Sequence, residues 1–207
     1  IHGGGLSGGD KTKPELIEVC ENYARRGYVV ISINYRLKRD NPPFEPGAVP
    51  ESAGLDGYII NCAAQDAAKA VGWIKDNAAT YGIDPTRIAI GGASAGAITA
   101  MFTAYQEDDV LPANADVGVV VDLWGSLVGA EADYIDVDDP PVFIFHGDED
   151  TTVPYYHAVN IDAHCTSIGL AHEFWTAPGK GHGLWYQFSN MNINGGYAEP
   201  AAAEFVY

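Results

Sequence analysis

One short apolar run, which stops at a serine between glycines, constrains this chain more than any other stretch. Residues 88–96 read Ile-Ala-Ile-Gly-Gly-Ala-Ser-Ala-Gly, and their apolar part predicts a buried strand. The next segment carries apolar side chains at helical spacing, namely Ile98, Met101, Phe102 and Tyr105. We therefore predict a strand that turns abruptly into a helix with Ser94 at the bend, where glycines leave room for the two close backbones. Such a turn presents the serine hydroxyl in a cleft.

Segments of strand and helix character alternate along the rest of the chain. Runs of mostly apolar sequence predict buried strands at residues 28–35, 87–90, 117–124 and 141–145, and a last strand is expected at residues 171–176. Helices are expected from a capping box at Thr12 to Gly27, after Ser94, at residues 64–78, 155–168 and 184–188, and in the last alanine-rich residues. Residues 36–60, rich in proline, predict a long irregular loop. This order predicts an α/β fold with a doubly wound, mostly parallel sheet and its chemistry at the carboxyl ends of the strands.

The composition bounds the class of protein. With 207 residues, 47% of them hydrophobic, the chain can bury one sizeable core, so we expect a single domain over residues 1–207. The formal net charge of -17 argues against nucleic acid or an anionic membrane surface as partner. No apolar run approaches the ~20 residues that span a bilayer, so a soluble chain is expected; its compartment and its oligomeric state stay open. Three cysteines (Cys20, Cys62, Cys165) are too few for a disulfide scaffold, and their pairing is also open.

A serine nucleophile requires a general base, and the chain offers six histidines. In a serine-acid-histidine chain order the base lies near the C-terminus. His182 stands in the flexible stretch Gly-Lys-Gly-His-Gly, just after the last expected strand. The other five lie in a helix, begin a strand or precede any suitable acid (His157 and His164; His172; His2 and His146). His182 is therefore the predicted base.

The acid that orients this histidine is expected on the loop after the preceding strand. Residues 146–150 read His-Gly-Asp-Glu-Asp and offer three carboxylates. The stretch at residues 146–154 resembles the His-Gly-x-x-Asp-x-x-Val-Pro segment of α/β-hydrolases. This resemblance places the acid at Asp150, with Asp148 as the alternative.

With Ser94, Asp150 and His182 in this order, the chain resembles the α/β-hydrolase superfamily. Within it, the resemblance is to carboxylesterases of the hormone-sensitive-lipase-like and type-B kinds, which carry His-Gly-Gly-Gly, here at residues 2–5, and Gly-x-Ser-Ala-Gly. Asn-Tyr-Arg-Leu at residues 34–37 also looks like a stretch common in these esterases. The resemblance implies an oxyanion hole formed by the backbone N–H groups of three residues (Gly4, Gly5 and Ala95), with His2 in a structural role.

The resemblance implies a carboxylic ester hydrolase that acts through an acyl-enzyme on Ser94 and requires no metal or organic cofactor. Histidine and cysteine spacing matches no zinc motif, and no glycine pattern for phosphate opens a helix. Two other interpretations stay open. One is a serine peptidase of the prolyl-oligopeptidase type, and the other is a non-catalytic interaction protein on the same fold.

The substrate is less constrained by the sequence. Residues 125–139 are too few for a helical cap between two strands, so we expect an open cleft and small, short-chain esters. Feruloyl or acetyl esters of plant polysaccharides are the alternative. Trp124 and Trp185 flank the catalytic segments and are the candidate substrate-binding residues, with Tyr186 beside them.

The strand that should lead into His2 is almost absent from this sequence. In the α/β-hydrolase pattern it lies between the strands expected at residues 28–35 and 87–90, yet only Ile1 precedes His2. Each unpaired N–H or C=O group on the facing edges would cost ~1 to 3 kcal/mol if kept from water. We therefore expect further strands upstream in the natural chain, or another segment in the gap. The alternative is that the two strands pair directly.

Overall fold

The central feature of the fold is a sheet of four parallel strands in the order β1-β2-β3-β4. A computed structural model describes residues 1–43, 54–106, 111–112, 114–128, 134–193 and 195–207. The strands are β1 (Ala89–Ala93), β2 (Val119–Leu123), β3 (Val142–Gly147) and β4 (His172–Ala177). Spatial order follows sequence order, so the chain returns after each strand to pair on the next edge in the same direction.

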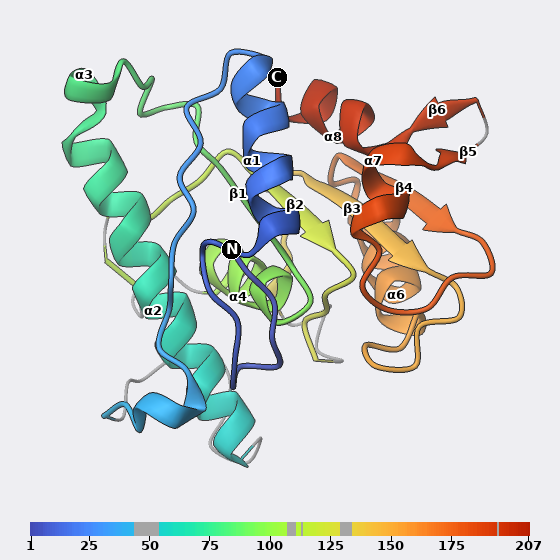
Figure 1. Ribbon diagram of the computed structural model, residues 1–207, viewed down its shortest axis with the longest axis horizontal. Coiled ribbons are helices and arrows are strands. Elements are labelled where there is room, and N and C mark those ends of the chain that lie inside the picture. Colours follow the sequence, from blue (N-terminus) through green and yellow to red (C-terminus); the bar gives the residue numbers. More distant parts are fainter. Residues whose placement is uncertain (44–53, 107–110, 113, 129–133, 194) are drawn as a thin grey trace.

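Helices cover both faces of the sheet (Figure 1). One face carries α2 (Gly54–Asp76), followed by the short α3 (Ala78–Tyr81), together with α4 (Ala95–Tyr105) and α6 (Tyr156–Ile168). The other face carries α1 (Pro14–Arg25), α7 (Trp185–Asn190) and α8 (Ala198–Val206). The predicted α/β architecture, with a parallel sheet between two helical layers, is confirmed.

Strand β3 shows how the sequence builds these two layers. Val142 and Ile144 point into the core under α4 and α6, whereas Phe143 and Phe145 point into the core under α7 and α8. All four side chains are fully buried, because successive side chains of a strand alternate between faces and both faces are covered. The following helix ends where expected, since Gly169 adopts a left-handed backbone with φ of 80°.

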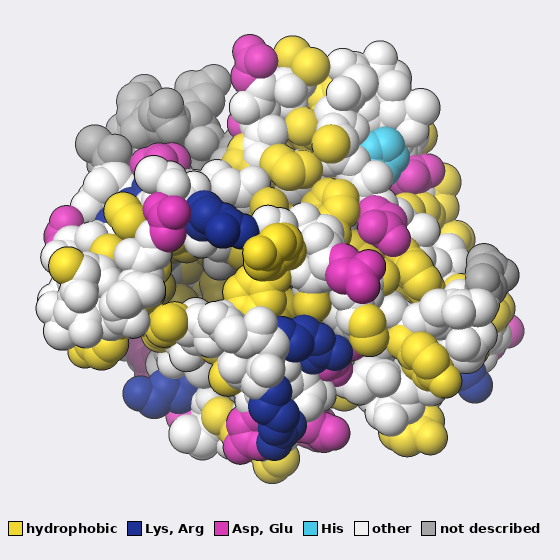
Figure 2. Space-filling model, turned by 90° about the horizontal axis from the view of Figure 1, so that it is seen from above, with side chains coloured by type: hydrophobic (Ala, Val, Ile, Leu, Met, Phe, Trp, Pro, Cys, Tyr) yellow, Lys and Arg dark blue, Asp and Glu magenta, His cyan; other side chains and the backbone are white. Residues whose placement is uncertain are grey.

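The strand expected at residues 28–35 does not form. No strand is assigned there, and Val29, Val30 and Ile31 are 52%, 38% and 39% exposed. Apolar side chains also lie open to solvent near the centre of the face shown in Figure 2, among scattered acidic and basic ones. The segment is instead tied by side chains to its surroundings, for example by Ser32 Oγ, which donates to the carbonyl of Lys11 at 2.8 Å. β-branched composition is not sufficient for a strand without a neighbour to accept its hydrogen bonds.

The first residue lies beside the edge of β1 that faces away from β2. The amino group of Ile1 donates to the Gly91 carbonyl at 2.6 Å, and the N–H of Ala93 donates to the Ile1 carbonyl at 3.3 Å. These two hydrogen bonds are those of a parallel ladder, so Ile1 occupies the position expected of a strand end. Within the described ranges β1 pairs in the sheet with β2 and not with residues 28–35, so direct pairing of those two segments is wrong.

Two helix starts differ from expectation. Helix α2 begins at Gly54, nearly three helical turns before residue 64, because Ile59 and Ile60 already pack into the core at 1% and 3% exposure. Residues 44–53 of the expected loop lie outside the described residues. The capping box at Thr12 does not form. The N–H and hydroxyl of Thr12 both donate to Asp10 Oδ1, so α1 starts one residue later with Lys13 as its N-cap.

Two further observations complete the fold. A hairpin that the sequence did not reveal, β5 (Asn192–Ile193) with β6 (Gly196–Tyr197), follows α7; two residues per strand are too few to show a periodicity. No helix in the described part of the chain is long and apolar enough to cross a membrane.

Candidate active site

Ser94 lies at a strained turn between β1 and α4. Its φ of 55° and ψ of -124° are rarely adopted by residues other than glycine, which is the strain expected where a strand turns at once into a helix. Gly92 and Gly96 permit this turn, because a Cβ on Gly92 would collide with the Gly96 backbone and a Cβ on Gly96 with the Ile1 carbonyl. The Ser94 N–H donates to the Leu123 carbonyl at 2.9 Å, which fixes the turn against β2. The hydroxyl is thereby held at the carboxyl end of the sheet.

His182 reaches Ser94 from the loop between β4 and α7. Its Nε2 lies 2.9 Å from Ser94 Oγ, and its side chain is 22% exposed. Gly183 follows with a left-handed φ of 83°, a conformation that glycine adopts without strain. The ring therefore stands at the solvent boundary, in contact with the serine hydroxyl.

Asp150 completes a line of three side chains. Its Oδ2 lies 2.6 Å from His182 Nδ1, while its Oδ1 accepts the N–H groups of Thr152 at 2.8 Å and Val153 at 3.0 Å. The carboxylate is fully buried, so these backbone donors compensate for lost hydration. The structure thus brings together Ser94, Asp150 and His182.

The alternative acid, Asp148, lies on the same loop but is exposed and does not contact His182 within the described residues. Its Oδ1 accepts the Gly179 N–H at 2.6 Å. A second bond runs from the Glu149 N–H to the Lys180 carbonyl at 2.9 Å. A Cβ on Gly147 would lie 2.7 Å from the Gly181 carbonyl, so the loops after β3 and β4 are in direct backbone contact.

His146 is a residue whose place in the site the sequence analysis missed. It is fully buried, and its Nε2 lies 2.9 Å from the Val153 carbonyl and 3.4 Å from Asp150 Oδ2. Since a carbonyl oxygen only accepts, Nε2 carries the proton, and burial lowers the pKa of His146, which favours the neutral ring. The motif His-Gly-x-x-Asp, in which the histidine precedes the aspartate by four residues, was the sequence signal that could have indicated this contact.

The glycine loop (residues 2–6) lies beside Ser94. A Cβ on Gly3 would approach the Ala93 carbonyl at 2.7 Å and Ser94 Cβ at 3.2 Å. Gly4 and Gly5 have φ of 139° and 59°, which glycine tolerates best. Within the described residues, the N–H groups of Gly4, Gly5 and Ala95 donate no hydrogen bond to a protein acceptor. Three donors beside the serine are therefore free to bind another group.

His2 does not face Ser94 as a reactive group. Its ring is 1% exposed and stacks on Tyr35 with centroids 4.5 Å apart, and burial is the main cause that lowers its pKa. The neutral, stacked ring fills space behind the glycine loop.

The two candidate substrate-binding tryptophans occupy different environments. Trp124 is 1% exposed and packs edge-on against Trp185, with ring centroids 5.2 Å apart. The expectation that Trp124 lines an open cleft is therefore contradicted, because its ring is part of the core. Trp185 is only partly buried, whereas Tyr186 is 72% exposed.

A further carboxyl group, on Asp122, lies inside the sheet at β2. Its side chain is completely buried, and burial raises its pKa to about 7. Oδ1 accepts the Gly125 N–H at 2.7 Å, which closes the turn that holds Trp124 at a φ of 48°. No group of three or more metal-ligating side chains is assembled within the described residues.

The fold and the site define a class of protein. A parallel sheet with a serine on the turn after β1, an aspartate after β3 and a histidine after β4 is the arrangement of an α/β-hydrolase.

Sequence comparisons agree with this class. The BD-FAE family model matches residues 57–127. Secreted lipase 5 of Gibberella zeae is 32% identical over 130 residues, which are 60% of this chain and 23% of that protein. Chlorogenic acid esterase of Aspergillus niger is 32% identical over 117 residues, 55% of this chain and 21% of that protein. The chain thus spans less than a quarter of the length of these two curated relatives.

Solved structures show the same fold over nearly the whole chain. Esterase 2 of Thermogutta terrifontis, phosphoramylated by tabun, matches with a TM-score of 0.74 and 22% identity over 99% of this chain and 80% of that one. The butyrate-bound form of the same esterase matches with a TM-score of 0.72 and 22% identity over 99% and 78%. The chain therefore has the α/β-hydrolase fold, and it is similar in sequence to a lipase and an esterase and in structure to an esterase.

Proposed function

We propose that this chain hydrolyses carboxylic esters, with Ser94 as nucleophile, His182 as general base and Asp150 as the acid that orients the histidine. The observation that carries the proposal is the unbroken line of hydrogen bonds from Ser94 Oγ through the His182 ring to Asp150 Oδ2, at 2.9 Å and 2.6 Å. Its geometry is that of an activated serine.

The direction of these hydrogen bonds supports the roles. A buried carboxylate accepts from His182 Nδ1–H, so Nε2 presents its lone pair to the Ser94 hydroxyl. Ser94 Oγ attacks the ester carbonyl carbon as its proton passes to Nε2. The tetrahedral adduct then expels the alcohol, which takes that proton from Nε2. Water repeats both steps on the acyl-enzyme and releases the carboxylic acid.

The free N–H groups of Gly4, Gly5 and Ala95 support a role as oxyanion hole. Donors that are already oriented need no reorganisation when charge develops on the carbonyl oxygen, and one such donor contributes about 3 kcal/mol of barrier reduction. Ala95 is the first residue of α4, so the positive end of the helix dipole adds to its N–H.

Small, short-chain esters are the proposed substrate class. The support is the structural similarity to an esterase solved with bound butyrate. Esters of plant phenolic acids are the second candidate, favoured by the sequence similarity to a chlorogenic acid esterase. The peptidase alternative shares the same catalytic geometry and differs in the substrate.

The test compares the chain with its Ser94→Ala variant on p-nitrophenyl esters of rising chain length, methyl ferulate, acetylated xylan and a prolyl peptide. We expect ester turnover that falls with acyl length and is lost in Ser94→Ala, whose fold is checked by circular dichroism. Turnover of the prolyl peptide above that of every ester would reassign the chain as a peptidase. Ester turnover that persists in Ser94→Ala would exclude Ser94 as nucleophile.

A further inference from the structure

The glycine loop depends on contacts from outside itself for its shape. Leu6 has a left-handed φ of 58°, which is costly for a residue with a Cβ. Inside the loop region the Gly4 carbonyl accepts the N–H groups of Ser7 at 3.2 Å and Gly8 at 3.0 Å. These short-range bonds form a turn, but they do not fix the turn relative to Ser94.

Residues 35–43, here called the strap, hold the glycine loop from one side. The Tyr35 hydroxyl donates to the His2 carbonyl at 3.1 Å, and the two rings stack. The Lys38 N–H donates to the Leu6 carbonyl at 2.8 Å. The strap is therefore hydrogen-bonded to the first and the last residue of the glycine loop.

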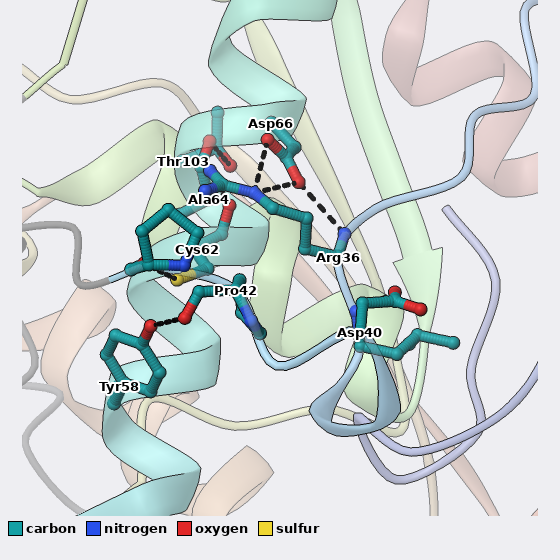
Figure 3. A network of polar contacts seen from close by, with 10 residues as sticks. Arg36, Asp40, Pro42, Tyr58, Cys62, Ala64, Asp66 and Thr103 are labelled. Carbon is teal, nitrogen blue, oxygen red and sulfur yellow. Dashed lines mark hydrogen bonds and ion pairs between the residues drawn. The ribbon is translucent and has the colours of Figure 1, made fainter.

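Helix α2 holds the strap from the other side (Figure 3). Asp66 Oδ2 accepts both the backbone N–H of Arg36 at 2.9 Å and its Nε–H at 2.8 Å. Asp66 Oδ1 accepts Nε–H at 2.9 Å, and Arg36 Nη2 donates to the Cys62 carbonyl at 3.2 Å. Further along, the Tyr58 hydroxyl of α2 donates to the Pro42 carbonyl. One carboxylate thus fixes both the side chain and the backbone of Arg36, with charge-assisted bonds.

Arg36 stands between the two residues that touch the glycine loop. Both members of its ion pair are mostly buried, with side chains 22% and 20% exposed, so the pair is only partly screened by water. Within the described part of the chain, the hydrogen bonds of the pair join the strap to α2 and not to the line of Ser94, His182 and Asp150. The contacts of the pair therefore reach the glycine loop through the strap.

We propose that the Arg36–Asp66 ion pair is a positioning device for the oxyanion loop: it anchors the strap to α2 so that Tyr35 and Lys38 hold Gly4 and Gly5 at their places beside Ser94. The inference rests on the proposed ester hydrolysis. It predicts that loss of the pair weakens stabilisation of the oxyanion more than binding of the substrate, since misplacement of a catalytic group by about 1 Å costs up to about a hundredfold in rate.

The test variant is Asp66→Asn, which keeps the size of the side chain and removes its charge. We expect kcat/KM for a short-chain p-nitrophenyl ester to fall about tenfold, with KM changed less than about twofold. The inhibition constant of a trifluoromethyl ketone, which binds Ser94 as a tetrahedral oxyanion, should rise by the same factor as kcat/KM falls. Arg36→Lys, which keeps the charge but lacks the planar fork, should give the same pattern.

The matched control is Asp116→Asn. Lys75 near the C-terminal end of the same helix α2 forms an ion pair at 2.8 Å with Asp116, which lies before β2, whereas the contacts of the strap are with Tyr58, Cys62 and Asp66 nearer the start of the helix. We expect no change in kcat/KM or in the inhibition constant. Hydrogen exchange of the peptide that covers residues 1–9 should increase in Asp66→Asn and not in Asp116→Asn.

The outcomes separate the two proposals. Unchanged exchange at residues 1–9 and an unchanged inhibition constant in both Asp66→Asn and Arg36→Lys would overturn the positioning role while ester hydrolysis stands. Equal rises in KM and in the inhibition constant would also overturn it, because they indicate a general loss of binding. If the unaltered chain hydrolyses no ester, the proposed function fails, and the exchange measurement still decides whether the ion pair holds the glycine loop.

Discussion

The ring of His146 lies 3.4 Å from the same Asp150 oxygen that accepts the hydrogen bond of His182 at 2.6 Å. The shared oxygen places one buried, neutral imidazole behind the acid and one partly exposed imidazole in front of it. His146 also donates to the carbonyl of Val153, and the N–H of Val153 donates to the other oxygen of Asp150. The acid is therefore held on both oxygens before any substrate binds.

Replacement of His146 tests whether this support matters for catalysis. His146→Phe removes the donor and leaves the Val153 carbonyl without its partner, so the free energy of unfolding should fall by about 1–3 kcal/mol. Because Asp150 then has more freedom, kcat should fall about tenfold. Urea denaturation and steady-state kinetics measure the two effects.

His164→Phe is the control for this prediction. His164 Nε2 lies 2.8 Å from the buried Ile135 carbonyl, which is the same kind of bond at a distance from Asp150 along the chain. The free energy of unfolding of His164→Phe should fall by a similar amount, and its kcat should stay that of the unaltered chain. A comparable fall in kcat for both variants would mean that His146 acts only through stability.

The two aspartates of the loop after β3 should differ sharply. In Asp150→Asn the amide can no longer hold His182 with Nδ1 protonated, so kcat should fall by roughly 10⁴-fold, as expected for loss of the correct tautomer. Asp148→Asn keeps an oxygen that can accept from Gly179 N–H, and its kcat should fall by less than about tenfold. Equal effects of the two substitutions, measured with the same ester, would contradict the assignment of the acid.

Asp122 predicts a pH dependence of stability. Because burial raises its pKa from 3.8 to about 7, the folded protein keeps a proton that the unfolded chain loses between these values. The free energy of unfolding therefore decreases as the pH rises from about 4 to about 7. The size of this contribution is about 4 kcal/mol, at 1.36 kcal/mol for each unit of pKa.

Asp122→Asn isolates that contribution, since an amide does not titrate in this range. The difference in unfolding free energy, unaltered chain minus variant, should fall steadily between pH 4 and pH 7 and then level off. Urea denaturation at four values of pH gives this difference directly. A difference that is constant across the range would show that Asp122 does not change its charge there.

Glu199 predicts a stability effect without a catalytic one. Its buried carboxylate binds Arg26 at 3.1 Å and Asn22 at 3.2 Å, and also accepts from Ser189, so it connects α1, α7 and α8. Glu199→Ala removes the acceptor of Asn22, Ser189 and Arg26, of which Arg26 keeps the Asn22 carbonyl, and should lower the free energy of unfolding by about 1–3 kcal/mol. Glu21→Ala, which removes an exposed pair with Arg25, should change it by less than about 0.5 kcal/mol. Both variants should keep the kcat of the unaltered chain once folded.

The fold could be predicted from the sequence where the local preference of a segment matches its surroundings in the folded chain. Gly169 ends α6 as expected, and the continuous apolar run of β3 identifies a strand that is covered on both faces. Residues 28–35 are similarly rich in apolar and β-branched side chains, yet they form no strand. Composition indicates that a segment favours a β-strand. Whether the strand forms depends on a neighbouring strand, which comes from a part of the chain that is distant in sequence.

The catalytic residues of the candidate site could also be predicted, because they lie in short local motifs. The glycines around Ser94 and the motif around Asp150 have local geometric causes, and each can be recognised in a few residues. The burial of Trp124 and the contact of His146 with Asp150 depend on tertiary packing. Asp122 gave no sequence signal, because an aspartate is usually exposed and only the turn at Gly125 explains its place inside β2.

The backbone contact between Gly147 and the loop that carries His182 has a consequence for engineering. Acid and base stand on two loops from neighbouring strands, but these loops are packed so closely that a longer loop after β3 would displace the histidine as well as the aspartate. If either loop alone were moved into another protein of this fold, it would lack the loop against which it packs. Successful exchange therefore requires both loops to be moved together, as a single interchangeable part.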